Sequence, residues 1–285
     1  MPERLSEIAA QIHNVRQLAT VVTAMRGIAA SRAQKGRALL AGIDAYTAVV
    51  SQAIGEALNV LPTASPAPAP AQSKRALILF CAEQGFAGAF SERVFEAAGG
   101  DLESAAILLV GTRGAAVASE QGIQPAWSTA MTTRVEGIAA FANGLAEALY
   151  GYVAQGAIAV AEIVFSRSVP GGLQVDRHSL LPIDLGRFAR PVEKEPPLIE
   201  LAPERLVEQL AAEYVYAQLC EAATHAFVAE NDARVSTMMA AKNNTEKKLA
   251  ALLQRERQLR QEEITTEIIE FAAGAEVLQS SRSPR

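Results

Sequence analysis

The sequence predicts an α+β protein in which a small α/β domain is inserted between two long helices that pair as an antiparallel coiled coil. Apolar residues recur in alternating steps of three and four over long segments at both ends of the chain. Short apolar runs bounded by turn-forming residues lie between these segments. Hydrophobic residues make up 50% of the chain and aromatic residues only 5%, which suits long helices that approach closely.

The first segment predicts one helix over residues 1–61. Only Arg26 and Thr47 interrupt its repeat, and a seven-residue repeat held this long predicts a left-handed supercoil with a partner helix. A helix of about 58 residues would be roughly 87 Å long. The positions of the repeat include Leu5, Ile8, Ile12, Val15, Val22, Ala29, Ala33, Gly36, Ile43, Val50 and Ile54.

Residues 62–74, PTASPAPAPAQSK, predict a stiff linker. An α/β domain of largely parallel sheet is expected over 75–199. Its strands are RALILF (75–80), SAAILLVG (104–111) and AIAVAEIVFS (157–166), with a helical stretch before the third. Residues 173–183 predict either an edge strand or a loop.

The second long helix is expected over 203–279, because Pro203 is a helix-start signal and no other proline occurs before residue 284. Its repeat runs through Val207, Tyr214, Val228 and Met238, and residues 280–285 form a tail. Asn231 occupies a seam position, where a buried amide would fix the register of the pair. A solvent-facing or subunit-facing Asn231 is the alternative.

Composition excludes several classes of protein. A net charge of −5 argues against a general nucleic-acid binder. The two cysteines have no framework or metal spacing, which indicates a reducing compartment. The N-terminus lacks the apolar core of a signal peptide, and no apolar run reaches the ~20 residues of a membrane span. We therefore expect a soluble intracellular protein without a transmembrane segment.

Evidence for catalysis is weak. VGTRGAAVASEQG follows a predicted strand and could place backbone N–H groups on a phosphate. However, it matches neither G-x-G-x-x-G nor G-x-x-x-x-G-K-[ST], the two common nucleotide-loop motifs. A tight turn between a strand and a helix explains Gly111 and Gly114. The three histidines are scattered. Cys81 has no histidine nearby in sequence and is expected to be a small buried residue. We expect no catalytic residue, cofactor or metal.

Charge is more informative. The N-terminal helix has no acidic residue between Glu7 and Asp44, and a second basic block lies on the far helix. A solvated helix face would explain either block alone. Two such blocks in an acidic protein predict a positive collar that meets an acidic partner. The collar, with Met25 beside it, comprises Arg26, Arg32, Lys35, Arg37, Lys242, Lys247, Lys248, Arg255, Arg257 and Arg260.

The terminal motifs resemble the gamma subunit of F-type ATP synthases. EIAAQIHNVRQLATVVTAMRGIAASR is similar to that family's first helix. AENDARVSTMMAAKNN and RQLRQEEITTEIIEFAAGAEVL are similar to its last helix. LLVGTRG and FSRSVPGGLQVDRHSLLPI also fit, so the resemblance covers essentially the whole chain.

The resemblance implies a non-catalytic rotor shaft that couples ion flow through a membrane c-ring to nucleotide turnover in a ring of alpha and beta subunits. The implied partners are those alpha and beta subunits, the epsilon subunit and the c-ring, with no small-molecule substrate of its own. The collar residues would face acidic loops of the beta subunits. An apolar bearing in the catalytic ring would hold Ile264, Ile268, Phe271 and Leu278. The implied location is peripheral, on the cytoplasmic face of the bacterial plasma membrane.

Two motifs depart from the family pattern. The family has Ser-Asp-Arg-Gly-Leu-Cys-Gly-Gly after the first strand of the inserted domain, whereas this chain has CAEQGFAGAF. Lysines usually flank the T-x-AM segment, but TVVTAMR keeps only Arg26. These differences suggest a diverged bacterial gamma, or the gamma of a second F-type ATPase that translocates Na⁺ or favours hydrolysis. A nucleotide-binding enzyme that uses residues 104–120 is the alternative from another class.

Overall fold

The structure is a computed structural model that describes residues 2–60, 74–189 and 199–280, with the side chains of 4–60, 75–189 and 199–273. The predicted linker and tail lie outside these ranges, except for Lys74 and Ser280 at their edges. The chain divides into two compact units, Met1–Gly27 with Ser236–Arg285, and Ile28–Val235, which are described separately. The domain bounds given by the sequence stay a prediction.

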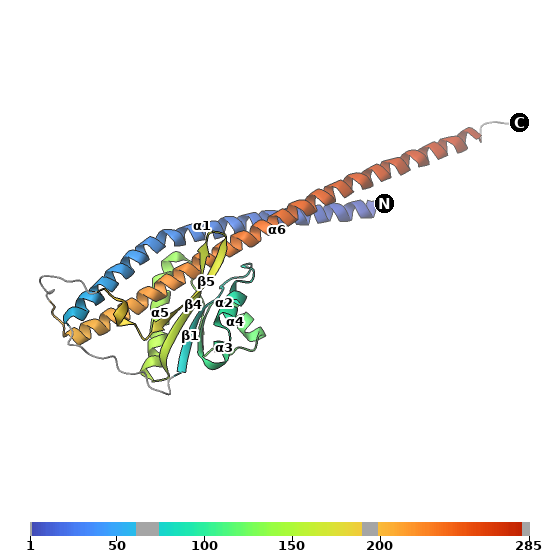
Figure 1. Cartoon of the computed structure of the whole chain (residues 1–285). Helices are drawn as coiled ribbons and strands as arrows, with labels where there is room; N and C mark the ends of the chain where they lie inside the picture. Colours follow the sequence, from blue (N-terminus) through green and yellow to red (C-terminus); the bar gives the residue numbers. More distant parts are fainter. Residues whose placement is uncertain (1, 61–73, 190–198, 281–285) are drawn as a thin grey trace. The chain divides into compact units, whose positions relative to one another are not determined.

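Two long helices dominate the fold (Figure 1). Helix α1 spans Pro2–Val60, and helix α6 spans Pro203–Ser280. Neither contains an internal proline, and Pro203 is the first residue of α6, where its missing N–H and fixed φ are tolerated.

Within the Ile28–Val235 unit the two helices run antiparallel. Val50 and Ile54 of α1 share a buried cluster with Val207 and Tyr214 near the start of α6. Ile43 packs with a later segment of α6 that includes Phe227. Residues later in α1 therefore contact residues earlier in α6, as an antiparallel pair requires. In the other unit, the buried seam side chains among the described residues are Ile12 and Val22 of α1 and Met238, Thr245 and Leu259 of α6.

A five-stranded sheet lies between the two helices in sequence, with the order β3-β2-β1-β4-β5. The strands are β1 Lys74–Phe80, β2 Ala106–Val110, β3 Trp127–Thr129, β4 Ile158–Val169 and β5 Gly172–Leu181. Strands β1 to β4 pair in parallel, and β4 and β5 form an antiparallel hairpin. The predicted fold class is confirmed, and the open choice over 173–183 resolves to an edge strand.

Helices cover both faces of the sheet. Alternate residues of β1 point to opposite sides, as pleating requires. Ile78 and Phe80 pack with α5 (Ile138–Ala154) and α6. Leu77 and Leu79 pack with α2 (Phe90–Ala98) and α4 (Thr112–Glu120). The short elements are α3 Asp101–Ser104 and the 3₁₀ turns η1 Val135–Gly137 and η2 Leu185–Arg187.

By length and composition, the described part of α1 also qualifies as a candidate membrane span over Arg4–Val60. This is weak evidence, because a long helix of a soluble protein passes the same test. Its seam residues Ile43, Val50 and Ile54 are buried in clusters with α6. The absence of a transmembrane segment stays a prediction.

Candidate functional site: a basic collar and a clamped loop

Small residues on α1 allow close helix packing in the Ile28–Val235 unit. Ala29 and Ala33 are 1% and 0% exposed. A Cβ atom added at Gly36 would lie 2.6 Å from Cγ2 of Val228 on α6, closer than real Cβ contacts. Gly36 therefore lets the side chain of Val228 pack directly against the backbone of α1.

The basic residues of α1 in this unit contact the inserted domain and α6. The guanidinium of Arg32 donates to Oε1 of Gln84 at 3.1 Å, in the loop after β1. Arg37 pairs with Asp232 of α6, which also accepts from the hydroxyl of Ser168 at 2.6 Å. Lys35 is exposed. Two of the three predicted collar residues here thus have structural contacts.

In the unit of Met1–Gly27 and Ser236–Arg285, collar residues pair with carboxylates only along their own helix, within the described residues. Lys242 lies 3.5 Å from Glu246, and Arg260 lies 2.6 Å from Glu256, both one turn away. Arg26 instead reaches Sδ of Met239 at 3.4 Å, while Met25 is half-buried. The exposed cations of α6 in this block are Lys247, Lys248, Arg255, Arg257 and Arg260.

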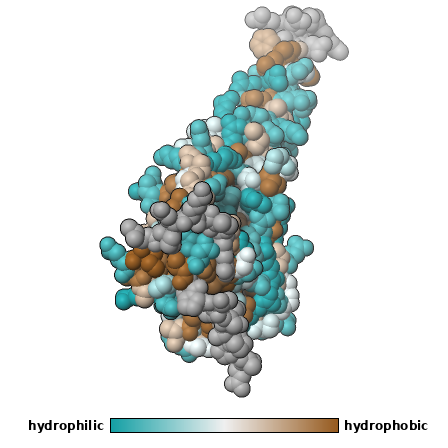
Figure 2. Space-filling model, turned by 60° about the vertical axis from the view of Figure 1, so that its left-hand side comes forward, coloured by the Kyte–Doolittle hydropathy of each residue, from teal (hydrophilic) through white to brown (hydrophobic). Residues whose placement is uncertain are grey.

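The proposed apolar bearing is exposed in the free chain. Ile264, Ile268 and Phe271 are 56%, 62% and 83% exposed. The side chain of Leu278 lies outside the described residues. On the face shown in Figure 2, hydrophobic residues alternate with hydrophilic ones along the helical part that ends at the grey C-terminal residues. Large exposed apolar side chains near one helix end are typical of a surface that a partner covers.

A buried ion pair on α6 clamps the loop after β1. Glu230 and Arg234 are both 5% exposed, and their side chains pair at 2.5 Å. The carboxylate of Glu230 accepts the backbone N–H groups of Glu83 and Gln84 at 3.1 and 3.0 Å. Arg234 donates to the carbonyl groups of Gln84 and Gly85, each at 3.1 Å. The divergent CAEQGFAGAF motif is thus bound to the helix by four hydrogen bonds to its backbone.

Glu83 joins this loop to two others at the carboxyl edge of the sheet. Its side chain accepts the backbone N–H and the hydroxyl of Thr112, at 2.9 and 2.8 Å, after β2. It also accepts the N–H of Met131 at 2.8 Å, after β3. One carboxylate therefore fixes the ends of three parallel strands, because such ends meet at one edge.

This arrangement argues against a nucleotide loop at residues 104–120. Glu83 occupies the N–H of Thr112 at the start of α4, where a phosphate would bind. Gly111 has a φ of +107°, and a Cβ there would lie 2.5 Å from the carbonyl oxygen of Cys81. A Cβ at Gly114 would lie 2.1 Å from Cβ of Cys81. Close packing on the end of β1 explains both glycines.

Cysteine and histidine residues show no catalytic arrangement in the described residues. Cys81 is 2% exposed, and burial raises the pKa of its thiol well above its usual value. His225 stacks on Phe165, and burial lowers the pKa of its imidazole. Across the part of the chain described, no group of three or more potential ligands could hold a metal ion.

Asn231 is buried and hydrogen-bonds along its own helix. Its amide donates to the carbonyl of Phe227 at 2.8 Å and accepts from Arg234 at 3.2 Å. It is 3% exposed, so the solvent-facing alternative is wrong. Its bonds support the clamp arginine. Glu83, Glu230 and Arg234 were not predicted from the sequence, although the four-residue spacing of Glu230 and Arg234 on one helix was a usable signal.

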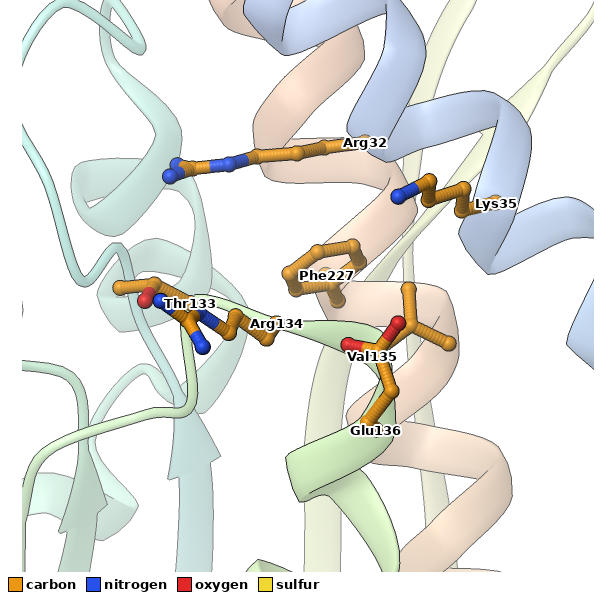
Figure 3. A pocket seen from close by; sticks show the side chains of 7 residues that line it. All are labelled: Arg32, Lys35, Thr133, Arg134, Val135, Glu136 and Phe227. Atoms are coloured by element: carbon orange, nitrogen blue, oxygen red, sulfur yellow. The ribbon is translucent and has the colours of Figure 1, made fainter.

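A pocket of about 370 Å³ lies beside the clamped loop (Figure 3). Arg32 and Lys35 extend from α1 on one side, and residues 133–136 line the other. Phe227 of α6 lies between them. All lining residues belong to the Ile28–Val235 unit.

Comparison with known proteins agrees with the fold and the terminal motifs. The family model described as ATP synthase matches residues 4–278. The ATP synthase gamma chain of Bdellovibrio bacteriovorus is 24% identical, over 96% of this chain and 99% of that protein. The gamma chain of a Parafrankia species is 27% identical, over 98% and 99%. Among solved structures, a chain of the Euglena gracilis mitochondrial ATP synthase has a TM-score of 0.67 at 11% identity, and the match covers 100% of this chain and 98% of that one.

A long helical pair with an inserted, mostly parallel sheet is the architecture of the ATP synthase central stalk. The family match covers nearly all described residues, including both long helices. The chain therefore belongs to the gamma-chain family of ATP synthases.

Proposed function

We propose that the chain is the central rotor shaft of a rotary F-type ATP synthase, and that it transmits torque between a membrane c-ring and a catalytic ring of alpha and beta subunits. The family match over residues 4–278 carries this proposal, because it includes both terminal helices and the inserted domain. The shaft makes and breaks no covalent bonds itself.

Torque transmission needs a stiff element and surfaces that a stator can push. Continuous α-helices over Pro2–Val60 and Pro203–Ser280 supply the stiff element. The collar supplies the surface on which the stator acts. Its exposed cations on α6, such as Lys247 and Lys248, have no carboxylate within 4.0 Å among the described residues. They are therefore available to acidic segments of a partner, and complementary charge sets register and specificity more than raw affinity.

The exposed apolar residues Ile264, Ile268 and Phe271 form the proposed bearing. An apolar sleeve formed by the alpha and beta subunits would cover them without fixing one orientation. Non-directional burial suits a contact that must persist while the shaft turns. The epsilon subunit and the c-ring are the proposed partners of the inserted domain.

We further propose that the complex lies on the cytoplasmic face of a bacterial plasma membrane and translocates H⁺ or Na⁺. Bacterial relatives at 24% and 27% identity support a bacterial setting. The ion is set by carboxylates of the c subunit, so the sequence of the neighbouring c-subunit gene discriminates between the two.

Reconstitution tests the proposed function. Alpha and beta subunits from the same source should form a complex with this chain that hydrolyses ATP faster than the ring without it. A ring that assembles and hydrolyses ATP equally well without the chain would contradict the proposal. Titration of the chain with NAD in a calorimeter tests the enzyme alternative, and the shaft function predicts no binding of that cofactor at residues 104–120.

A further inference from the structure

The pocket between α1 and residues 133–136 gathers positive charge from two separate parts of the chain. Three positive side chains, Arg32, Lys35 and Arg134, line it together with one negative side chain, Glu136. Within the described residues, no carboxylate oxygen lies within 4.0 Å of the charged nitrogen atoms of these three residues. Like charges gathered without counterions repel one another, so an anion would relieve the repulsion.

Hydrogen bonds restrain two of these cations. Arg32 is held by its hydrogen bond to Gln84, whose backbone is itself bound by Glu230 and Arg234. The backbone of Arg134 is fixed by Thr132, whose hydroxyl donates to the carbonyl at 2.8 Å and accepts the N–H at 3.2 Å. Groups placed before a ligand arrives lose less entropy on binding.

Size and charge favour a phosphate group over a single carboxylate. A volume of about 370 Å³ lies within the range of small-ligand pockets. A phosphate carries a charge of about −1.5 to −2 near neutral pH, with three acceptor oxygens. Arginine guanidinium groups bind such oxygens in pairs, and Lys35 adds a point charge. A lone carboxylate offers two oxygens and one charge to three cations.

We propose that this pocket binds a small phosphate-class oxyanion, such as inorganic phosphate, pyrophosphate or the phosphate groups of a nucleotide. Arg32, Lys35 and Arg134 bind the anion. Glu136 limits its affinity by repulsion. The proposal goes beyond the rotor function and involves no covalent step.

Titration of the full-length chain, without alpha or beta subunits, tests the proposal. Phosphate, pyrophosphate and ADP are titrated separately by calorimetry, with ³¹P NMR line broadening as a second readout. Arg134→Gln and Lys35→Gln should each weaken phosphate binding by about tenfold, the loss expected for one charge-assisted contact. Glu136→Gln should tighten binding, which a merely structural role would not produce.

Arg93→Gln is the matched control, because Arg93 is an exposed arginine of α2 that does not line the pocket. Its affinity for phosphate should equal that of the unmodified chain. If ADP and pyrophosphate bind with equal affinity, the phosphate groups alone are the ligand. If ADP binds more tightly, and Arg134→Gln and Lys35→Gln still weaken its binding, the pocket also contacts the nucleoside.

Three results would overturn the proposal: no binding of any of the three anions at 10 mM (roughly the weakest useful affinity), binding that Arg134→Gln and Lys35→Gln leave unchanged, or binding of a glutamate-rich peptide that phosphate does not displace. Because these titrations use the free chain, their failure leaves the reconstitution test of the rotor function unaffected.

Discussion

The two compact units use their charged residues differently. In the Ile28–Val235 unit, charged side chains connect separate elements, as Arg37 of α1 does with Asp232 of α6 and Arg234 of α6 does with the loop after β1. In the unit of Met1–Gly27 and Ser236–Arg285, the ion pairs found in the described residues join neighbours on one helix, such as Lys242 with Glu246. The difference separates charges that maintain the fold from charges that are available to partners.

The largest expected effect follows from breaking the buried clamp. Arg234→Met leaves the carboxylate of Glu230 buried without its cation, and loss of one partner of a buried pair costs about 3–5 kcal/mol. Urea unfolding should show this loss. The double variant Glu230→Gln with Arg234→Met should recover part of it, since no uncompensated charge remains. Unchanged stability in Arg234→Met would show that the clamp is not structural.

A smaller effect is expected at the close helix contact. Gly36→Ala places a Cβ 2.6 Å from the side chain of Val228, and overpacking costs about 1–3 kcal/mol. Gly42→Ala on the same helix meets nothing within 4 Å. This control should gain about 0.5–1 kcal/mol from higher helix propensity. Equal effects of the two variants would mean that the helices do not approach closely at Gly36.

Glu83→Gln should destabilise the chain by about 1–3 kcal/mol, because an amide cannot accept from all three donors that the carboxylate serves. Hydrogen exchange should speed up first at the N–H groups of Thr112 and Met131. Uniform exchange changes across the domain would instead indicate a general loss of stability without a local role for Glu83.

Acid stability should depend on Arg177. Its hydrogen bond lowers the pKa of the Asp101 carboxyl. For Glu162, partial burial raises the pKa, but hydrogen bonds from Arg75 and Arg177 outweigh burial and lower it. Lowered carboxyl pKa values stabilise the folded state above the unfolded values, near pH 4, and this contribution is lost as pH falls through the folded values. Arg177→Gln should flatten the fall in melting temperature between pH 5 and pH 2 (roughly the window of these groups).

The smallest stability effect is expected at the exposed collar. Lys247→Gln with Lys248→Gln removes exposed charges, and such changes usually alter stability by less than about 0.5 kcal/mol. The pair should nevertheless lower the ATPase rate of the reconstituted complex. A large drop in melting temperature would place these lysines among the structural charges.

Much of the fold could be predicted because it depends on patterns that the sequence carries locally. The heptad repeat predicts the helix pair, and apolar runs predict β1, β2 and β4. Strand β3 was not predicted, because Trp127–Thr129 has only three residues, all half-buried or exposed, which is too few to show the alternation of a strand. The clamp was not predicted because Arg234 reaches the backbone of Gln84 and Gly85 only once α6 packs against the inserted domain. Fold-dependent contacts between residues far apart in sequence leave no local pattern, and the same holds for the pocket that joins Arg32 with Arg134.

In the proposed function, exposed collar charges on α6 transmit torque to a surrounding stator. The most direct measurement is the number of ions pumped per ATP hydrolysed by the complete complex in vesicles, with Lys247→Glu, Lys248→Glu and Arg255→Glu combined in this chain. The variant should assemble and keep its melting temperature, but pump fewer ions per ATP than the unmodified complex. An unchanged ratio in an assembled, equally stable variant would contradict it.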